Sequence, residues 1–389
     1  MKILIISPWC DDMDLETCKG TPENAYLLKG LLDKGHEIIY VCQGKSEKVP
    51  ENLLRYKNLR VLCVKPFRLL KPPQINYIAN FFRLKAYGRT LLETLEPLLR
   101  KENFDIIYNI GGYGHLEILN LSRTYKVPYA VKTMGTIHFE ETRRKFYRKF
   151  QYLKEHLIFK YRARHYFLVD DGTKTVEIAK SYGIPDNMIT ILPNPKPSEL
   201  RPAPRNAGSL TIGYFSRFDR LKGTDLFYKI AMKILSKMQN VKFLIAGDGP
   251  MLNKVKKLEE MFPLNVQYVG FLEHKNLIEY YYKIDILLST NRYSNSTLPV
   301  IEALASGATV VAFNTQDTSK MVLHGVNGLL ATPFNLNEIS GHILTLLNDP
   351  SLLQKLWEGA RNTASYIPTW EERINLEINK LEEIAGEVH

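Results

Sequence analysis

Two basic residues whose side chains suit phosphate oxygens stand in one short loop of this 389-residue chain. Arg217 and Lys222 lie in the segment Gly-Tyr-Phe-Ser-Arg-Phe-Asp-Arg-Leu-Lys-Gly, residues 213–223, directly after a buried-strand pattern. A guanidinium offers a planar fork of donors and an ammonium offers a compact charge, and both bind phosphate. As isolated residues they would be solvated loop charges, but two neighbouring loops favour a binding role.

The first of these loops, Gly247-Asp248-Gly249, follows the next strand pattern and precedes Pro250 at the start of a helix. Glycines let a backbone approach a ligand closely, although the same sequence also suits an ordinary strand-to-helix turn. We predict that this loop contributes to binding of a diphosphate-containing donor.

A second polar loop runs into a helix about seventy residues after Arg217 and Lys222. The free N–H groups of a helix N-terminus, together with nearby hydroxyls, form an anion site. Glu302, one turn inside this helix, could hydrogen-bond a ribose diol, or it could simply be exposed. The candidate residues of this loop are Ser294, Asn295, Ser296, Thr297 and Leu298.

The strands and helices that must position these loops alternate along the whole chain. Short apolar strands separated by helical segments predict parallel sheets covered by helices on both faces. The strands form two series, so the predicted fold class is α/β with two doubly wound, Rossmann-like domains. A proline-rich segment near residue 200 separates an N-terminal domain (1–200) from a C-terminal domain (201–368). A final helix within residues 369–389 is expected to pack back on the N-terminal domain.

Positive charge is concentrated in the first half of the chain. The net charge is +11, and residues 52–165 carry 23 Lys and Arg against 8 Asp and Glu. Basic stretches with interleaved aromatic residues favour an anionic membrane surface, whereas the alternative is a core helix with a solvated basic face. No nucleic-acid recognition motif accompanies the charge, so we expect no nucleic-acid partner.

The apolar run at the start of the chain is too short for a signal peptide, and no apolar stretch reaches the roughly 18 residues that span a bilayer. We therefore expect a cytoplasmic protein, or one bound peripherally to the cytoplasmic face of a membrane.

The C-terminal half resembles the retaining glycosyltransferases of family 4, which have the two-domain GT-B fold. Ser216-Arg217 and Lys222-Gly223 match the family's diphosphate-binding segment, and residues 247–250 match its Gly-Asp-Gly-Pro loop. Glu302-Ala-Leu-Ala-Ser-Gly matches the end of its Glu-x7-Glu signature, and residues 325–330 match a later Gly-x-Asn-Gly segment. In the first half, Gly20-Thr21 and Gly35-His36-Glu37 continue the resemblance more weakly.

The resemblance implies a transferase that moves a sugar from a nucleotide sugar, UDP- or GDP-linked, to a lipid-linked or glycan acceptor. Arg217 and Lys222 would stabilise the departing diphosphate without a metal ion or other cofactor. Gly20 and Thr21 would face the donor from the opposite wall of a cleft, and backbone near Phe271 and Leu272 would contact the base.

The chain departs from the family pattern at three places. Ser294 stands where the signature has its first Glu, and Met134 stands where a catalytic-region His is expected. Asn194-Pro-Lys-Pro replaces an Asn-Gly-x-Asp segment. His138, four residues past the expected position, is the remaining candidate for a general base or a sugar contact.

Two other functions are compatible with the sequence. A nucleotide-sugar epimerase of the same fold would need paired acid and base carboxylates, and Ser294 argues against these. A non-catalytic subunit that binds nucleotide sugar would explain the replacements at 294 and 134 as lost chemistry.

Overall fold

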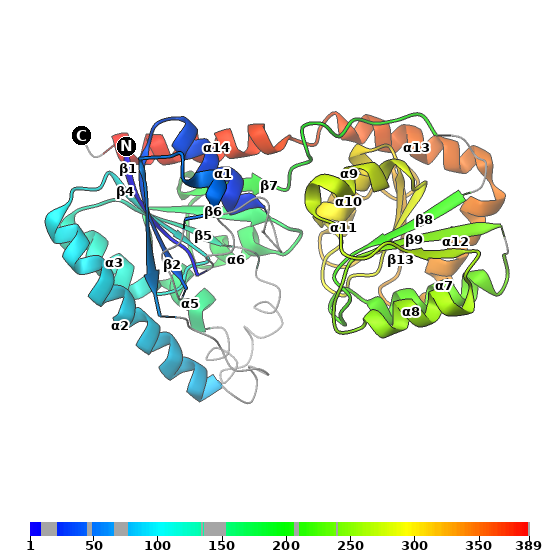
Figure 1. The fold of residues 1–389 in the computed structure, drawn as a ribbon, viewed down its shortest axis with the longest axis horizontal. Coiled ribbons are helices and arrows are strands. Elements are labelled where there is room, and N and C mark those ends of the chain that lie inside the picture. Colours follow the sequence, from blue (N-terminus) through cyan, green and yellow to red (C-terminus); the bar gives the residue numbers. More distant parts are fainter. Residues whose placement is uncertain are drawn as a thin grey trace. The chain divides into compact units, whose positions relative to one another are not determined.

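The computed structural model describes residues 1–8, 22–44, 49–65, 77–133, 135, 153–205, 210–238 and 240–387 (Figure 1). The chain divides into two compact units. Unit 1 contains Met1–Asp170, Lys174–Leu192 and Glu372–His389, and unit 2 contains Asp171–Thr173 and Pro193–Glu371. The crossing at Leu192 lies slightly before the predicted boundary at residue 200.

Unit 1 is built on a seven-stranded sheet with the order β3-β2-β1-β4-β5-β6-β7, in which neighbouring strands from β3 to β6 are parallel. Its strands are β1 (Lys2–Ile6), β2 (Glu37–Gln43), β3 (Leu59–Val64), β4 (Ile106–Ile110), β5 (Tyr129–Thr133), β6 (His165–Asp170) and β7 (Ile189–Pro193). Its helices are α1 (Glu23–Asp33), α2 (Tyr77–Lys101), α3 (His115–Tyr125), α5 (Leu153–Lys160), α6 (Thr175–Ser181) and α14 (Trp370–Gly386), with 3-10 turns at Glu51–Leu53 and Asp186–Met188.

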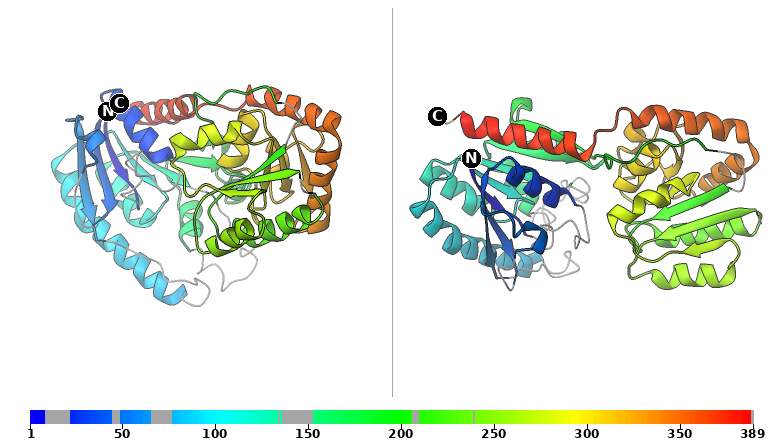
Figure 2. Two further views of the ribbon diagram at one scale, coloured as in Figure 1. Left: turned by 45° about the vertical axis from the view of Figure 1, so that its right-hand side comes forward. Right: turned by 45° about the horizontal axis from the view of Figure 1, so that its top comes forward.

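Successive side chains along a strand point to opposite faces of the sheet, so the position of a residue in its strand decides which helices it faces. Leu4, Ile107 and Val131 pack in one core with α2, α3, α5 and α6. Residues of the opposite parity face α1 and α14, which lie side by side over the other face of the sheet (Figures 1 and 2). Both faces of this sheet are therefore covered.

Unit 2 is built on a six-stranded parallel sheet with the order β10-β9-β8-β11-β12-β13. Its strands are β8 (Leu210–Phe215), β9 (Val241–Ala246), β10 (Val266–Tyr268), β11 (Ile286–Ser289), β12 (Thr309–Phe313) and β13 (Gly328–Ala331). Its helices are α7 (Thr224–Leu235), α8 (Leu252–Met261), α9 (His274–Tyr282), α10 (Leu298–Ala305), α11 (Thr318–Met321), α12 (Leu336–Asn348) and α13 (Pro350–Ala364). One core contains residues of α7, α8 and α12, and another contains residues of α9 and α10.

The two predicted series of strands are confirmed, but β13 was missed. It has four residues and begins with Gly328, which weakens a strand pattern because it has no side chain to pack. A Cβ at Gly328 would clash with the carbonyl oxygen of Val310 on β12, which explains the glycine. Over the described ranges, no helix combines the length and apolar character that crossing a bilayer requires.

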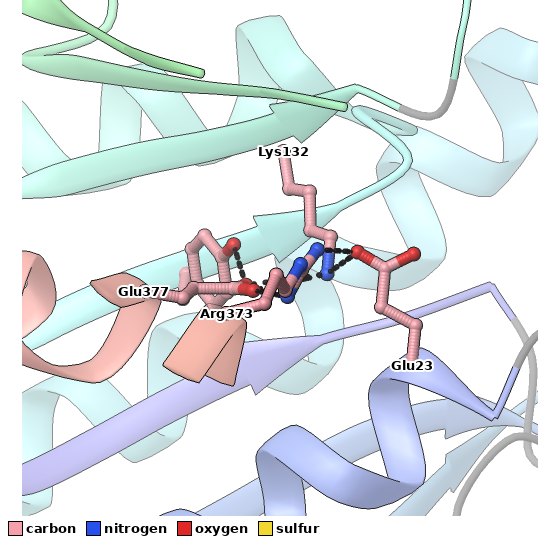
Figure 3. A network of polar contacts seen from close by, with 5 residues as sticks. Glu23, Lys132, Arg373 and Glu377 are labelled. Carbon is pink, nitrogen blue, oxygen red and sulfur yellow. Dashed lines mark hydrogen bonds and ion pairs between the residues drawn. The ribbon is translucent and has the colours of Figure 1, made fainter. Parts of the chain in front are cut away.

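Helix α14 is joined to the rest of unit 1 by a buried cluster of charged side chains (Figure 3). The ammonium of Lys132 on β5 lies 2.6 Å from Glu23 Oε1 on α1 and 3.2 Å from Glu377 Oε1 on α14. Arg373, also on α14, forms ion pairs with both Glu23 and Glu377. The hydroxyl of Tyr108 on β4 donates to Glu377.

This cluster is neutral because two cations face two carboxylates, and it is nearly sealed from solvent. Glu377 and Lys132 are 0% exposed, and Arg373 is 1% exposed. Burial alone raises the pKa of the Glu377 carboxyl, but Arg373 and Lys132 outweigh burial and hold this pKa below its usual value. Breaking a buried pair leaves an uncompensated charge, which is strongly destabilising.

We predict that Glu377→Ala lowers the free energy of unfolding by about 3–5 kcal/mol, because it leaves Arg373 and Lys132 with one carboxylate between them. Urea-induced unfolding measures this loss. Glu383→Ala, on the same helix, removes an exposed carboxylate that pairs with Lys380 and is the matched control. Its expected loss is about 0–1 kcal/mol. Equal losses in the two variants would contradict the proposed role of the cluster.

Candidate active site

Strands β8 and β11 are neighbours at the point where the chain order in unit 2 reverses. The chain leaves β8 through α7 toward β9, and it leaves β11 through α10 toward β12, on the other side. Loops that diverge from adjacent parallel strands open a crevice at their carboxyl ends, and ligands of doubly wound sheets bind in such crevices. The loops here, 216–223 and 290–297, are two that the sequence singled out.

Asp219 shapes the loop after β8. Its Oδ1 accepts a hydrogen bond from the backbone N–H of Lys222 (2.8 Å), and its Oδ2 accepts one from Nε of Arg217 (2.5 Å). Gly223 then begins the turn into α7 with a φ of 73°, in the left-handed region. A Cβ at this position would also clash with the carbonyl oxygen of Thr290, so glycine is required for two reasons.

Asn295 organises the loop after β11 from inside the protein. It is 0% exposed, and its Oδ1 accepts hydrogen bonds from Ser289 Oγ (2.6 Å) and the backbone N–H of Asn291 (3.2 Å). Its Nδ2 donates to the backbone oxygen of Phe313 (2.9 Å) and to Thr315 Oγ1 (2.9 Å). Because these bonds occupy the amide, Asn295 positions the loop, and its predicted contact with a donor stays a prediction.

The two loops are fastened to each other. The guanidinium of Arg292 binds both carboxylate oxygens of Asp225, at 2.8 and 2.7 Å, and lowers the pKa of this carboxyl. Thr290 Oγ1 donates to the backbone oxygen of Gly223 (3.0 Å). Sequence reasoning missed the Arg292–Asp225 pair, since the partners are separated by 67 residues and no motif spacing links them.

A pocket of about 100 Å³ lies between the fastened loops. It is smaller than the roughly 300–1000 Å³ of pockets that enclose drug-sized ligands, so it suits a small group rather than a whole nucleotide. Among its lining residues are Ser216, Arg217, Lys222, Thr290, Thr297 and Pro299.

The charge of this pocket is positive. Burial and the neighbouring Arg217 lower the pKa of Lys222, although Asp219 opposes them. Among the described residues, the Lys222 ammonium has no hydrogen-bond or ion-pair partner. The Arg217 side chain is 63% exposed and is held to Asp219 through Nε, which leaves its terminal nitrogens available. An anion in the pocket would relieve the repulsion between these two cations.

The glycines of the Gly247-Asp248-Gly249 loop lie against the loop after β8. A Cβ at Gly247 would clash with the backbone oxygen of Ser216, and a Cβ at Gly249 would clash with the backbone of Phe218. The N–H of Phe218 donates to the carbonyl of Asp248 (2.7 Å). The glycines therefore let this loop support the loop after β8, while the Asp248 side chain is exposed. The predicted contact of this loop with a donor stays a prediction.

The loop predicted to contact the nucleotide base, residues 270–272, lies next to the Gly247-Asp248-Gly249 loop. The N–H of Gly247 donates to the carbonyl of Gly270 (2.9 Å), and the next residue, Phe271, is 56% exposed. Leu272 is half-buried and packs against the apolar core. Phe271 thus presents an aromatic ring to solvent.

The N-terminus of α10 completes the pocket. Thr297 is the residue before Leu298 and makes no side-chain capping bond, and both Thr297 and Pro299 line the pocket. A helix N-terminus carries partial positive charge and favours an anion. Ser294 and Ser296 are buried, and Ser294 Oγ accepts a hydrogen bond from the Ser296 N–H (3.1 Å), so their hydroxyls support the loop.

Glu302 does not line the pocket. Its carboxylate is 1% exposed, and its Oε2 accepts a hydrogen bond from the Tyr281 hydroxyl (2.7 Å). Burial and the Glu302 charge raise the pKa of Tyr281, which keeps this hydroxyl a donor. The predicted contact of Glu302 with a ribose stays a prediction. Gly20, Thr21, Met134 and His138 lie outside the described residues.

Comparison with known proteins finds a similarity in the unit that contains this pocket. Residues 195–363 match the family model of "Glycosyl transferases group 1". The chain is 22% identical over 193 residues to the alpha-D-kanosaminyltransferase of Streptomyces kanamyceticus, covering 49% of this chain and 44% of that protein. It is 30% identical over 129 residues to one component of the human phosphatidylinositol N-acetylglucosaminyltransferase, covering 32% of this chain and 27% of that protein. These matches span less than half of either relative.

Two longer matches cover both units. An uncharacterised glycosyltransferase of Methanocaldococcus jannaschii is 22% identical over 379 residues, 91% of this chain and 90% of that protein. The structure of sucrose-phosphate synthase from Thermosynechococcus elongatus superposes with a TM-score of 0.74 over 100% of both chains at 18% identity. The predicted GT-B fold is confirmed by this likeness, and residues 195–363 resemble the group 1 glycosyl transferases.

Proposed function

We propose that this chain transfers a sugar from a nucleotide-sugar donor whose diphosphate binds between the loops after β8 and β11. The observation that carries the proposal is the Lys222 ammonium, which is half-buried in a small pocket beside Arg217. When the bond between sugar and phosphate breaks, negative charge builds up on the departing diphosphate. Cations that are already in place stabilise this charge without reorganisation during the reaction.

Two fixed cations and a helix N-terminus can supply the charge compensation for which many phosphate-processing sites use divalent ions. We therefore propose transfer without a metal ion. We also propose retention of configuration at the sugar, because the Streptomyces relative is named an alpha-D-kanosaminyltransferase. A donor with an alpha linkage to diphosphate that gives an alpha-linked product retains its configuration.

The donor nucleoside is proposed to be uridine or guanosine, with the exposed ring of Phe271 available for stacking on its base. Thermal shift with a panel of nucleotide sugars identifies the donor, since a ligand at 100 times its Kd stabilises a protein by about 2.7 kcal/mol.

The acceptor is proposed to be lipid-linked or otherwise borne by an anionic membrane. Between residues 77 and 92, α2 carries Arg83, Lys85 and Arg89 and no acidic residue. On the same stretch Phe82 is 63% exposed, and basic residues with an exposed aromatic ring suit the membrane interface. The human relative is named for a phosphatidylinositol substrate.

We predict that Arg217→Ala and Lys222→Ala each lower kcat about 10²–10³-fold, the usual effect of removing one preorganised donor to a developing charge. Release of nucleoside diphosphate in the presence of acceptor is the measurement, and it also separates transfer from epimerisation. Arg220→Ala, which removes an exposed charge from the same loop outside the pocket, is the matched control and should retain turnover. Near-normal turnover in both pocket variants would refute the assignment.

The lowered pKa of Lys222 predicts a pH dependence of diphosphate binding. Binding requires the protonated ammonium, so affinity for the nucleoside diphosphate should fall as the pH rises through this pKa, below the range of an ordinary lysine. The Lys222→Arg variant keeps a positive charge at this position, because arginine stays protonated. Its affinity for the nucleoside diphosphate should therefore fall only at higher pH. Calorimetric titrations between pH 7 and 10 test this. Parallel pH profiles for the two proteins would exclude Lys222 as the binding cation.

We predict salt-sensitive co-sedimentation with liposomes that contain anionic lipid. Each Lys or Arg near such a surface contributes about 1 kcal/mol, so R83Q/K85Q/R89Q should weaken binding roughly a hundredfold. The triple variant K254Q/K256Q/K257Q removes three exposed charges from α8 in unit 2 and is the control. Wild-type binding to neutral and anionic liposomes at equal strength would rule out this docking.

A further inference from the structure

A second pocket lies within unit 1, and its lining is mainly apolar. It has a volume of about 270 Å³ and is bounded by α2, α3, α5 and the loop after β4. Apolar atoms of Phe81, Leu84, Leu116 and Leu157 contribute to its walls. This volume corresponds to about nine water molecules, so it can take a slender group of roughly that many heavy atoms.

The pocket lies at the end of the sheet where ligands of this fold class bind. Strands β1 and β4 are neighbours at the point where the strand order of unit 1 reverses. Gly112 and Gly114, in the loop after β4, line the pocket with φ values of 70° and 68°. A Cβ on Gly112 would clash with Ile158, and one on Gly114 would clash with Leu91. This side of the pocket is therefore backbone, with no side chain that could fill it.

The polar groups of the pocket leave room for an apolar occupant with a negatively charged head. His115 is buried, its ring nitrogens lie 2.9 Å from the Tyr129 hydroxyl and 2.6 Å from the Tyr161 carbonyl oxygen, and burial lowers its pKa to about 4. It is therefore neutral near pH 7. Lys154 donates to the Gly111 carbonyl (3.1 Å) and lies 3.2 Å from Glu155.

Lys85 is exposed at the pocket, and its ammonium stands 5.8 Å from the centroid of the Phe81 ring. Glu117 is the acidic residue of the lining. Together with Arg83 and Arg89, Lys85 makes this part of α2 positive, and the exposed ring of Phe82 adjoins it. Charge and apolar lining thus complement one occupant, a hydrocarbon chain that ends in phosphate.

We propose that this pocket receives the hydrocarbon chain of an anionic, lipid-borne acceptor, with its phosphate near Lys85. The inference rests on the proposed transferase function, and it adds the place where unit 1 recognises the lipid. A chain held there would present its head group at the carboxyl edge of the sheet, where the loop after β4 leaves the strand.

Isothermal titration with n-alkyl phosphates of six, eight and ten carbons, below their critical micelle concentrations, tests the pocket directly. Burying one methylene contributes about 0.8 kcal/mol, so affinity should rise about fourfold per added carbon until the pocket is full. An alkyl trimethylammonium of equal length should bind at least tenfold more weakly than the phosphate. Affinity that is independent of chain length, or equal for the cation, would overturn the proposal.

Leu84→Trp and Leu116→Phe each place a larger side chain in the pocket from a different helix, and each should weaken alkyl phosphate binding at least tenfold. Leu54→Trp adds the same bulk at an exposed leucine of unit 1 and is the matched control. Circular dichroism and thermal unfolding identify any variant that is misfolded. Wild-type affinity in both folded pocket variants would refute the site.

A transfer assay separates this inference from the proposed function. If lipid-borne and short water-soluble acceptors are both used, Leu116→Phe should raise KM for the lipid acceptor alone. Transfer with unchanged KM for both acceptors would refute the pocket and leave the transferase standing. Chain-length-dependent binding without transfer to any acceptor would support the pocket and refute the transferase.

Discussion

The site in unit 2 depends on one topological constraint, the reversal of strand order between β8 and β11. Parallel neighbours whose connections leave to opposite sides cannot have their loops packed over each other, so a gap remains at their carboxyl ends. Thr290 then joins the loop after β11 to Gly223, and Arg292 joins it to Asp225 in the first turn of α7, which together hold the two sides of this gap. The pocket is thus a consequence of chain order, and hydrogen bonds between distant residues set its dimensions.

The two units treat buried charge in opposite ways. Lys132 in unit 1 is sealed from solvent and faces two carboxylates and an arginine in a neutral cluster, which fastens the C-terminal helix (Figure 3). Lys222 in unit 2 is half-buried beside a second cation, with no paired carboxylate among the described residues. The first arrangement is complete within the protein. The second becomes more favourable when an anion arrives, because desolvated like charges repel.

Several motif residues hold the loops of the site in place. The glycines at 247 and 249 permit contact between two loops. Asn295 and Glu302 are turned into the protein, where the first holds the loop after β11 and the second receives the Tyr281 hydroxyl. A motif therefore marks residues that a site requires, but it does not say which of them touch a ligand.

The sequence alone determined the α/β class, the two sheets, the strands other than β13, and the basic loop with Arg217 and Lys222. Apolar periodicity and loop composition are local properties, so they can be read without coordinates. Tertiary structure alone decided the Arg292–Asp225 bridge, the buried cluster around Glu377, and the apolar pocket of unit 1. These features join residues far apart in the chain, and burial and distance exist only after the chain has folded.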